Sequence, residues 1–109
     1  MYTQEAVTKL IQQFVEIVSP VISIKSLYLF GSYATGTMRE YSDIDVAVVS
    51  DDFQGIRFTD RQRINKLLIE RTYPNYPFAD LEVHPFTTED FITDNPFVDE
   101  ILRAGKRMI

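Results

Sequence analysis

The spacing of apolar residues along the chain predicts the type of most of its elements. Over residues 3–18 apolar side chains recur every three or four positions, which is typical of an amphipathic helix, and Pro20 follows its end. The apolar run 26–30 has the length of a buried strand. Residues 43–49 are rich in β-branched side chains and residues 78–85 alternate apolar and polar ones, so both segments predict strands.

Local capping signals predict the remaining helices. Residues 59–62 have the pattern of a capping box, which predicts a second helix from there to about Arg71. Residues 87–90 predict a short helical turn. Asn95, which is followed by a proline, predicts the start of a last helix.

The order of these elements is helix, strand, loop motif, strand, helix, strand, helix. It favours the α/β class in the form of an α+β sandwich, with a small mixed β-sheet and helices packed mainly on one face. The last helix is expected to end near Gly105, and residues 106–109 are expected to fray. Residues 1–109 are expected to form a single domain, because a chain of this length supports one modest core.

Residues 31–45 carry the strongest chemical signal. Gly31 directly follows a predicted strand and permits close approach of the backbone to a ligand. Ser32 is expected to cap a short helix, whose free N–H groups suit a phosphate. Asp43 and Asp45 share one face of a predicted strand, about 7 Å apart. Two carboxylates so placed repel each other unless they hold a cation, and oxygen ligands favour Mg²⁺ or Mn²⁺.

A third carboxylate is available on the strand predicted over residues 78–85. Asp80, Glu82 and His84 lie on one face of that strand if the alternation holds. Such a carboxylate can accept the proton of an attacking hydroxyl and bind metal. The register between the strands is open, so Asp80 and Glu82 both remain candidates, with Glu82 favoured for its longer reach. His84 is predicted to be an ordinary surface histidine.

The spacing of Gly31-Ser32 and Asp43-Ile44-Asp45 resembles the signature of the minimal nucleotidyltransferases, which belong to the polymerase β-like superfamily and include the MntA-type antitoxins of HEPN/MNT pairs. The resemblance extends over nearly the whole chain, because the order of elements is similar too. Within the motif it also includes Gly36, Arg39 and Ser42.

The resemblance implies a set of site residues. Gly31, Ser32, Arg39 and Ser42 would bind the nucleotide. Catalysis and metal binding would fall to Asp43, Asp45 and Glu82. The sequence Glu82-Val83-His84-Pro85 is similar to a stretch found at this point in such proteins, which supports Glu82, whereas the aspartate usual in the wider superfamily keeps Asp80 as the alternative third ligand.

The implied reaction is Mg²⁺-dependent transfer of a nucleoside monophosphate, AMP from ATP, to an acceptor hydroxyl. In many similar proteins the acceptor is a tyrosine of a partner HEPN toxin, and the transferase acts as its antitoxin. Two alternatives remain open. The acceptor is a small molecule such as an aminoglycoside, or the chain is a binding module that neutralises its partner without catalysis.

Composition narrows the remaining classes. The chain has no cysteine, which excludes disulfides and zinc–thiolate sites. No apolar run reaches the roughly 18 residues that a membrane span needs, so no membrane association and a cytoplasmic location are expected. The net charge of −5 argues against nucleic acid as a partner. Arg61 and Arg63, near the start of the second helix, are expected to face solvent, with a contact to the triphosphate as the alternative.

Overall fold

The computed structural model describes all residues from 1 to 109 and contains four helices and four strands. In chain order they are α1 (Gln4–Val18), β1 (Ser26–Phe30), α2 (Ser32–Thr35), β2 (Ile44–Val49), α3 (Arg57–Thr72), β3 (Leu81–Phe86), α4 (Pro96–Ala104) and β4 (Lys106–Arg107). The predicted order of elements is confirmed, with β4 as an addition.

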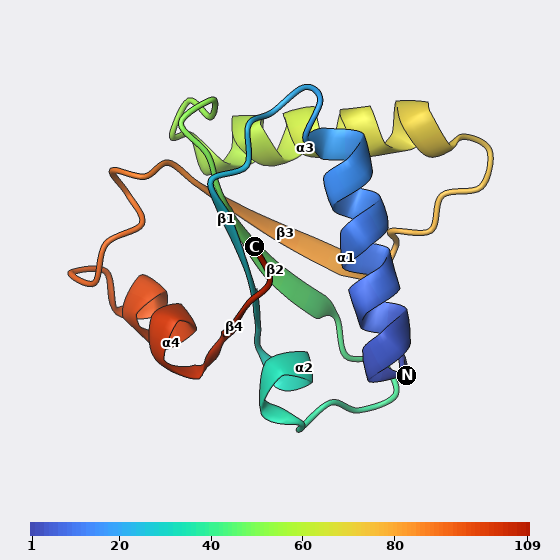
Figure 1. Ribbon diagram of the computed structural model, residues 1–109, viewed down its shortest axis with the longest axis horizontal. Coiled ribbons are helices and arrows are strands. Elements are labelled where there is room, and N and C mark those ends of the chain that lie inside the picture. The colour runs from blue at the N-terminus through green and yellow to red at the C-terminus, as the bar shows by residue number, and fades with distance from the viewer.

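The four strands form one mixed sheet in the order β3-β2-β1-β4. Strand β1 runs antiparallel to β2 and β4, whereas β2 and β3 are parallel. Helices α1 and α3 lie together on one side of the sheet and α4 lies on the other side (Figure 1). The predicted fold class, a small mixed sheet with helices mainly on one face, is therefore confirmed.

The main core lies between the sheet and the two long helices. Strand β2 contributes Ile44, Val46 and Val48, which are fully buried and alternate with residues that face the other way. Helix α1 contributes Phe14 and Val18, also fully buried. Since these alternate side chains of β2 point into the core, Asp45 is left on the opposite face of the sheet, where the candidate site lies.

Helix α3 begins earlier than its sequence pattern predicts. Its first residue is Arg57, so the capping box expected at residues 59–62 is wrong. Asp60 is buried, and its two carboxylate oxygens accept hydrogen bonds from the backbone N–H groups of Gln54 at 2.9 Å and Gly55 at 3.0 Å. The acidic residue thus anchors the loop before the helix from inside the first turn, a role that the local pattern does not distinguish from a cap.

The C-terminal residues are ordered, so the expected fraying of residues 106–109 is wrong. Lys106 and Arg107 pair with β1, and the backbone N–H of Met108 donates to the carbonyl of Leu27 at 2.8 Å. Gly105 permits this return, because a Cβ there would lie 2.5 Å from the carbonyl oxygen of Ile101. The predicted cap of α4 at Asn95 and the predicted turn at residues 87–90 are confirmed. The structure adds Thr3 as the N-cap of α1.

Candidate active site

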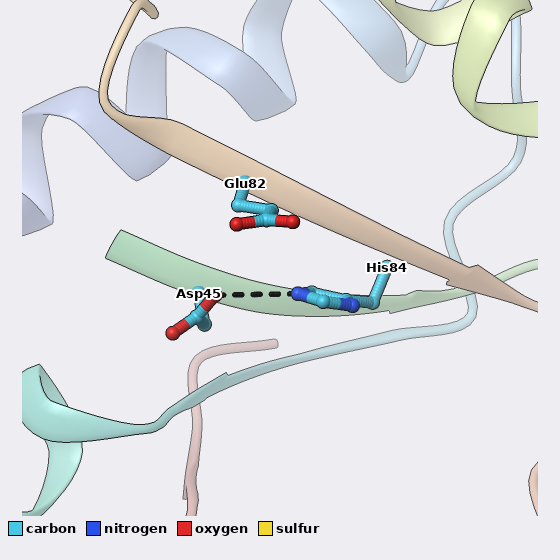
Figure 2. A group of neighbouring side chains, drawn as sticks. All are labelled: Asp45, Glu82 and His84. Carbon is cyan, nitrogen blue, oxygen red and sulfur yellow. Dashed lines mark hydrogen bonds and ion pairs between the residues drawn. The ribbon is translucent and has the colours of Figure 1, made fainter. Parts of the chain in front are cut away.

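The parallel pairing of β2 and β3 brings three polar side chains together on the sheet face opposite the main core. Asp45 and Glu82 are directly paired in the register, and His84 follows two residues later on the same side of β3. One ligand atom from each of the three lies within 4.8 Å of the others. Figure 2 shows the Asp45 carboxylate facing the His84 ring, with Glu82 beside them.

The carboxylate of Asp45 is held between His84 and the glycine turn that follows β1. Its Oδ1 lies 3.2 Å from His84 Nε2. Its Oδ2 lies against Gly31, where an added Cβ would stand only 2.6 Å away. Gly31 also has a φ of 75°, a backbone conformation that favours glycine. The turn and the carboxylate therefore fit together only because residue 31 has no side chain.

His84 is buried, with 8% of its surface exposed, so its prediction as a surface histidine is wrong. Its ring packs edge-on against Phe30, at 5.0 Å between centroids, and against Phe97, at 5.8 Å. The guanidinium of Arg57 contacts its Nδ1 and lies 5.9 Å from the centre of the Phe97 ring. Strand alternation had placed His84 on the same face as Glu82, but it gave no signal of the burial or of the contact with Asp45.

Two arginines from the start of α3 border this group. Arg57 contacts His84, and Arg61 lies 3.5 Å from Glu82 Oε1. The Arg61 pair is more than a third exposed, so its contribution to stability is small. The solvent-facing prediction is thus wrong for Arg61, whereas Arg63 turns away and donates to the carbonyl of Asp52 at 3.0 Å. The arginines add positive charge beside two carboxylates.

Asp43 and Asp80 lie outside the three-residue group. Asp43 is exposed and immediately precedes β2. Asp80 precedes β3 and accepts a hydrogen bond at 2.8 Å from the hydroxyl of Tyr2, at the start of α1. That hydrogen bond, together with burial and the negative charge of Asp80, raises the pKa of Tyr2. Asp80 was expected to share a strand face with Glu82, but strand β3 begins only at Leu81, so the alternation of side chains does not extend to Asp80.

The predicted nucleotide-binding residues lie on the turn and loop after β1. Gly31, not Ser32, is the N-cap of α2; Ser32 is the first helical residue, so its expected capping role is wrong. Gly31 and Ser32 line a cavity of about 310 Å³ that also reaches Phe97 on α4. Further along, the backbone N–H of Arg39 donates to the hydroxyl of Ser42 at 2.8 Å, which shapes the exposed loop before β2.

The donor set of the group fits a divalent cation. A divalent cation with metal–oxygen distances of about 2.1 Å needs its ligand atoms close together, and one ligand atom of each of the three residues lies within 4.8 Å of the others. Two carboxylates from adjacent strands supply the hard oxygen ligands that Mg²⁺ and Mn²⁺ prefer. The residues present therefore fit the predicted metal.

The fold and this group define a protein class, and the comparison with protein families identifies it. The model of the nucleotidyltransferase domain matches residues 7–102, which is most of the chain. The chain therefore belongs to the nucleotidyltransferase domain family, and the membership predicted from the motif is confirmed. A comparison with curated protein sequences gives no match.

Three solved structures illustrate the fold. A protein described as a nucleotidyltransferase from Sulfolobus solfataricus is 23% identical, with a TM-score of 0.58 over 79% of this chain and 71% of that one. A toxin–antitoxin complex with AMP-PNP is 22% identical, with a TM-score of 0.60 over 94% and 72%. An MntA-HpeT toxin–antitoxin variant is 20% identical, with a TM-score of 0.59 over 94% and 72%. At these identities the likeness establishes the fold alone.

None of the helices is both long and apolar enough to cross a membrane.

Proposed function

We propose that this chain is a Mg²⁺- or Mn²⁺-dependent nucleotidyltransferase that moves AMP from ATP to an acceptor hydroxyl, which attacks the α-phosphorus and displaces pyrophosphate. The observation that carries the proposal is the group Asp45, Glu82 and His84 beside the Gly31 turn, in a nucleotidyltransferase domain. Carboxylates for metal and a backbone turn for phosphate thus lie next to each other, as phosphoryl transfer requires. We place the activity in one domain, residues 1–109.

Each site residue has a distinct part in this proposal. Asp43 and Asp45 would hold the metal, with Glu82 as the third ligand and Asp80 as its alternative. A metal held there would supply positive charge to neutralise the phosphates. Glu82 also accepts the proton of the attacking hydroxyl. It lies on the edge strand β3, next to Asp45 on β2, whereas the Gly31 turn follows β1 on the other side of β2.

The nucleotide contacts follow from the arrangement of the turn. The backbone N–H of Gly31 and the hydroxyl of Ser32 face the triphosphate in this proposal, since both residues line one cavity and Gly31 lies against Asp45. Arg39 and Ser42, on the loop before β2, add further contacts to the nucleotide.

The proposed biological role is that of an antitoxin. Two of the similar structures are toxin–antitoxin proteins, one with the ATP analogue AMP-PNP and one with two aspartates, spaced like Asp43 and Asp45, changed to glutamate. These likenesses support ATP as the substrate and a toxin as the partner. We propose a tyrosine of a HEPN toxin as the acceptor. Because ATP is an intracellular substrate, we place the reaction in the cytoplasm.

Incubation of the purified protein with labelled ATP and Mg²⁺ tests this function. With its gene-neighbour protein present, a mass increase of one AMP on a tyrosine of that protein is expected. Omission of Mg²⁺ is the control and should abolish the label. Transfer to a small molecule instead would favour the second acceptor class. Tight partner binding with no transfer to any acceptor would favour the non-catalytic module.

The glycine turn yields a separate prediction. Ser32→Ala is expected to weaken ATP binding by about 2 kcal/mol, the scale of a hydrogen bond to a charged group. Gly31→Val is expected to be more harmful, because its side chain would collide with Asp45 Oδ2 and meet an unfavourable φ. Titration calorimetry measures both affinities. As a control, Ser23→Ala, at an exposed position before β1 and so at the opposite end of that strand from the turn, should bind ATP nearly as well as the wild type. Unchanged affinity in both turn variants would mean that the turn is only structural.

A further inference from the structure

The single histidine of the chain has contacts that the proposed nucleotide and metal chemistry does not use. We infer that His84 is a positioning residue: its buried ring contacts Asp45 through Nε2 and Arg57 through Nδ1, and so orients the Asp45 carboxylate without itself binding metal. The inference rests on the proposed function for the metal, but the contacts of the ring belong to the structure itself.

The first step is the engagement of both ring nitrogens. Nδ1 lies against the guanidinium of Arg57. Nε2 lies 3.2 Å from Asp45 Oδ1, and a carboxylate only accepts hydrogen bonds, so Nε2 is the donor of that bond. Both nitrogens are thus occupied by neighbouring side chains.

The second step is the rigidity of the ring. His84 is 8% exposed and packs edge-on against Phe30 and Phe97, which come from β1 and α4. Arg57 is itself held against the Phe97 ring. Because the ring is held by these aromatic contacts and at both nitrogens, it restricts the orientation of the Asp45 carboxylate that it contacts.

The third step is what the orientation does to Asp45. With Oδ1 engaged by His84, the carboxylate plane is fixed so that Oδ2 lies against Gly31, beside the proposed phosphate turn. Partners behind metal ligands of this kind affect metal affinity by about 10–100-fold when they are removed. Loss of the His84 donor is therefore expected to weaken metal binding without removing a ligand.

The first experiment measures the ring directly in the metal-free wild type. Because the chain has only one histidine, ¹⁵N-histidine labelling yields signals from His84 alone. Long-range ¹H–¹⁵N correlation spectra are expected to show a proton on Nε2, the nitrogen that donates to Asp45. A ring without a proton on Nε2 would overturn the inference. This measurement needs no variant and no activity.

The second experiment asks whether His84 touches bound metal. Electron spin echo spectra of the same labelled protein with Mn²⁺ alone are expected to lack the ¹⁵N coupling of a directly bound imidazole. The presence of that coupling would make His84 a ligand and overturn the inference. If Mn²⁺ does not bind the wild type at all, the proposed metal function fails, while the ring state in the metal-free protein still decides the inference about the hydrogen bonds.

Matched variants test positioning. His84→Leu is expected to weaken Mn²⁺ binding about 10–100-fold, and His84→Gln, which retains a donor, should recover most of that affinity. Arg57→Gln should cause a smaller loss, whereas Arg63→Gln, on the same helix but turned to Asp52, should cause none. Equal losses in His84→Leu and His84→Gln, with unchanged thermal unfolding, would contradict a role through the hydrogen bond.

Discussion

Replacing Asp43 and Asp45 together with asparagine is expected to abolish nucleotidyl transfer and to leave the fold intact. Both carboxylates are proposed metal ligands, and groups that act as a unit lose nearly all activity when any member is removed. The fold should survive because the amide oxygen of an asparagine at position 45 can still accept a hydrogen bond from His84. Removal of two like charges near each other relieves repulsion, so stability should be equal or higher.

Transfer rates and thermal unfolding of the double variant and both single variants measure this result. Asp45→Asn alone is expected to approach the loss of the double variant, since Asp45 is the aspartate that lies with Glu82 and His84. Asp43→Asn tests whether the exposed Asp43 joins the metal when nucleotide is bound, and a loss of at least 10²-fold is expected. A double variant that transfers at the wild-type rate would contradict the proposed site.

The second large effect is expected at the third carboxylate. Glu82→Gln should slow turnover by 10²-fold or more, the usual scale for loss of a general base. ATP affinity should hardly change, because Asp43 and Asp45 remain to hold the metal that accompanies the triphosphate. Asp80→Asn should leave turnover nearly unchanged, since its carboxylate is held by Tyr2 at the start of α1 and not beside Asp45.

Single-turnover rates and calorimetric ATP affinities separate these two acids. Asp80→Asn is the matched control, because it removes the same kind of charge two residues away from Glu82 on the same segment. An inactive Asp80→Asn with a nearly normal Glu82→Gln would reverse the assignment and keep the family. If neither variant loses activity, the acceptor supplies its own base or the chain does not catalyse transfer.

Arg61 offers a link between the metal-free and substrate-bound states. It pairs with Glu82, while Arg57 reaches His84, so both arginines balance charge around the two carboxylates. A bound cation would compete with Arg61 for Glu82, because both need the same carboxylate oxygens. Arg61 would then be free to bind an anionic group. The triphosphate contact given above as the alternative for Arg61 requires this release from Glu82.

Local pattern alone determined most of the fold. The helix over α1, the strand 26–30 and the Asn95 cap depend on neighbours within one helical turn or one strand, so periodicity and capping chemistry predicted them correctly. The motif from Gly31 to Asp45 was recognisable for the same reason. Its spacing is set along one continuous segment, and the family it indicated is confirmed.

Tertiary structure decided the partners of the site. The pairing of β2 with β3 set Glu82 beside Asp45, and the departure of the chain before Leu81 directed Asp80 to Tyr2. The burial of His84 depends on Phe30 and Phe97, which lie on other elements. Strand register and the packing between distant segments do not produce a periodic pattern of residues that could be recognised in the sequence. The motif was therefore predictable, whereas the position of Glu82 beside Asp45 and the burial of His84 emerged only when the strands were paired.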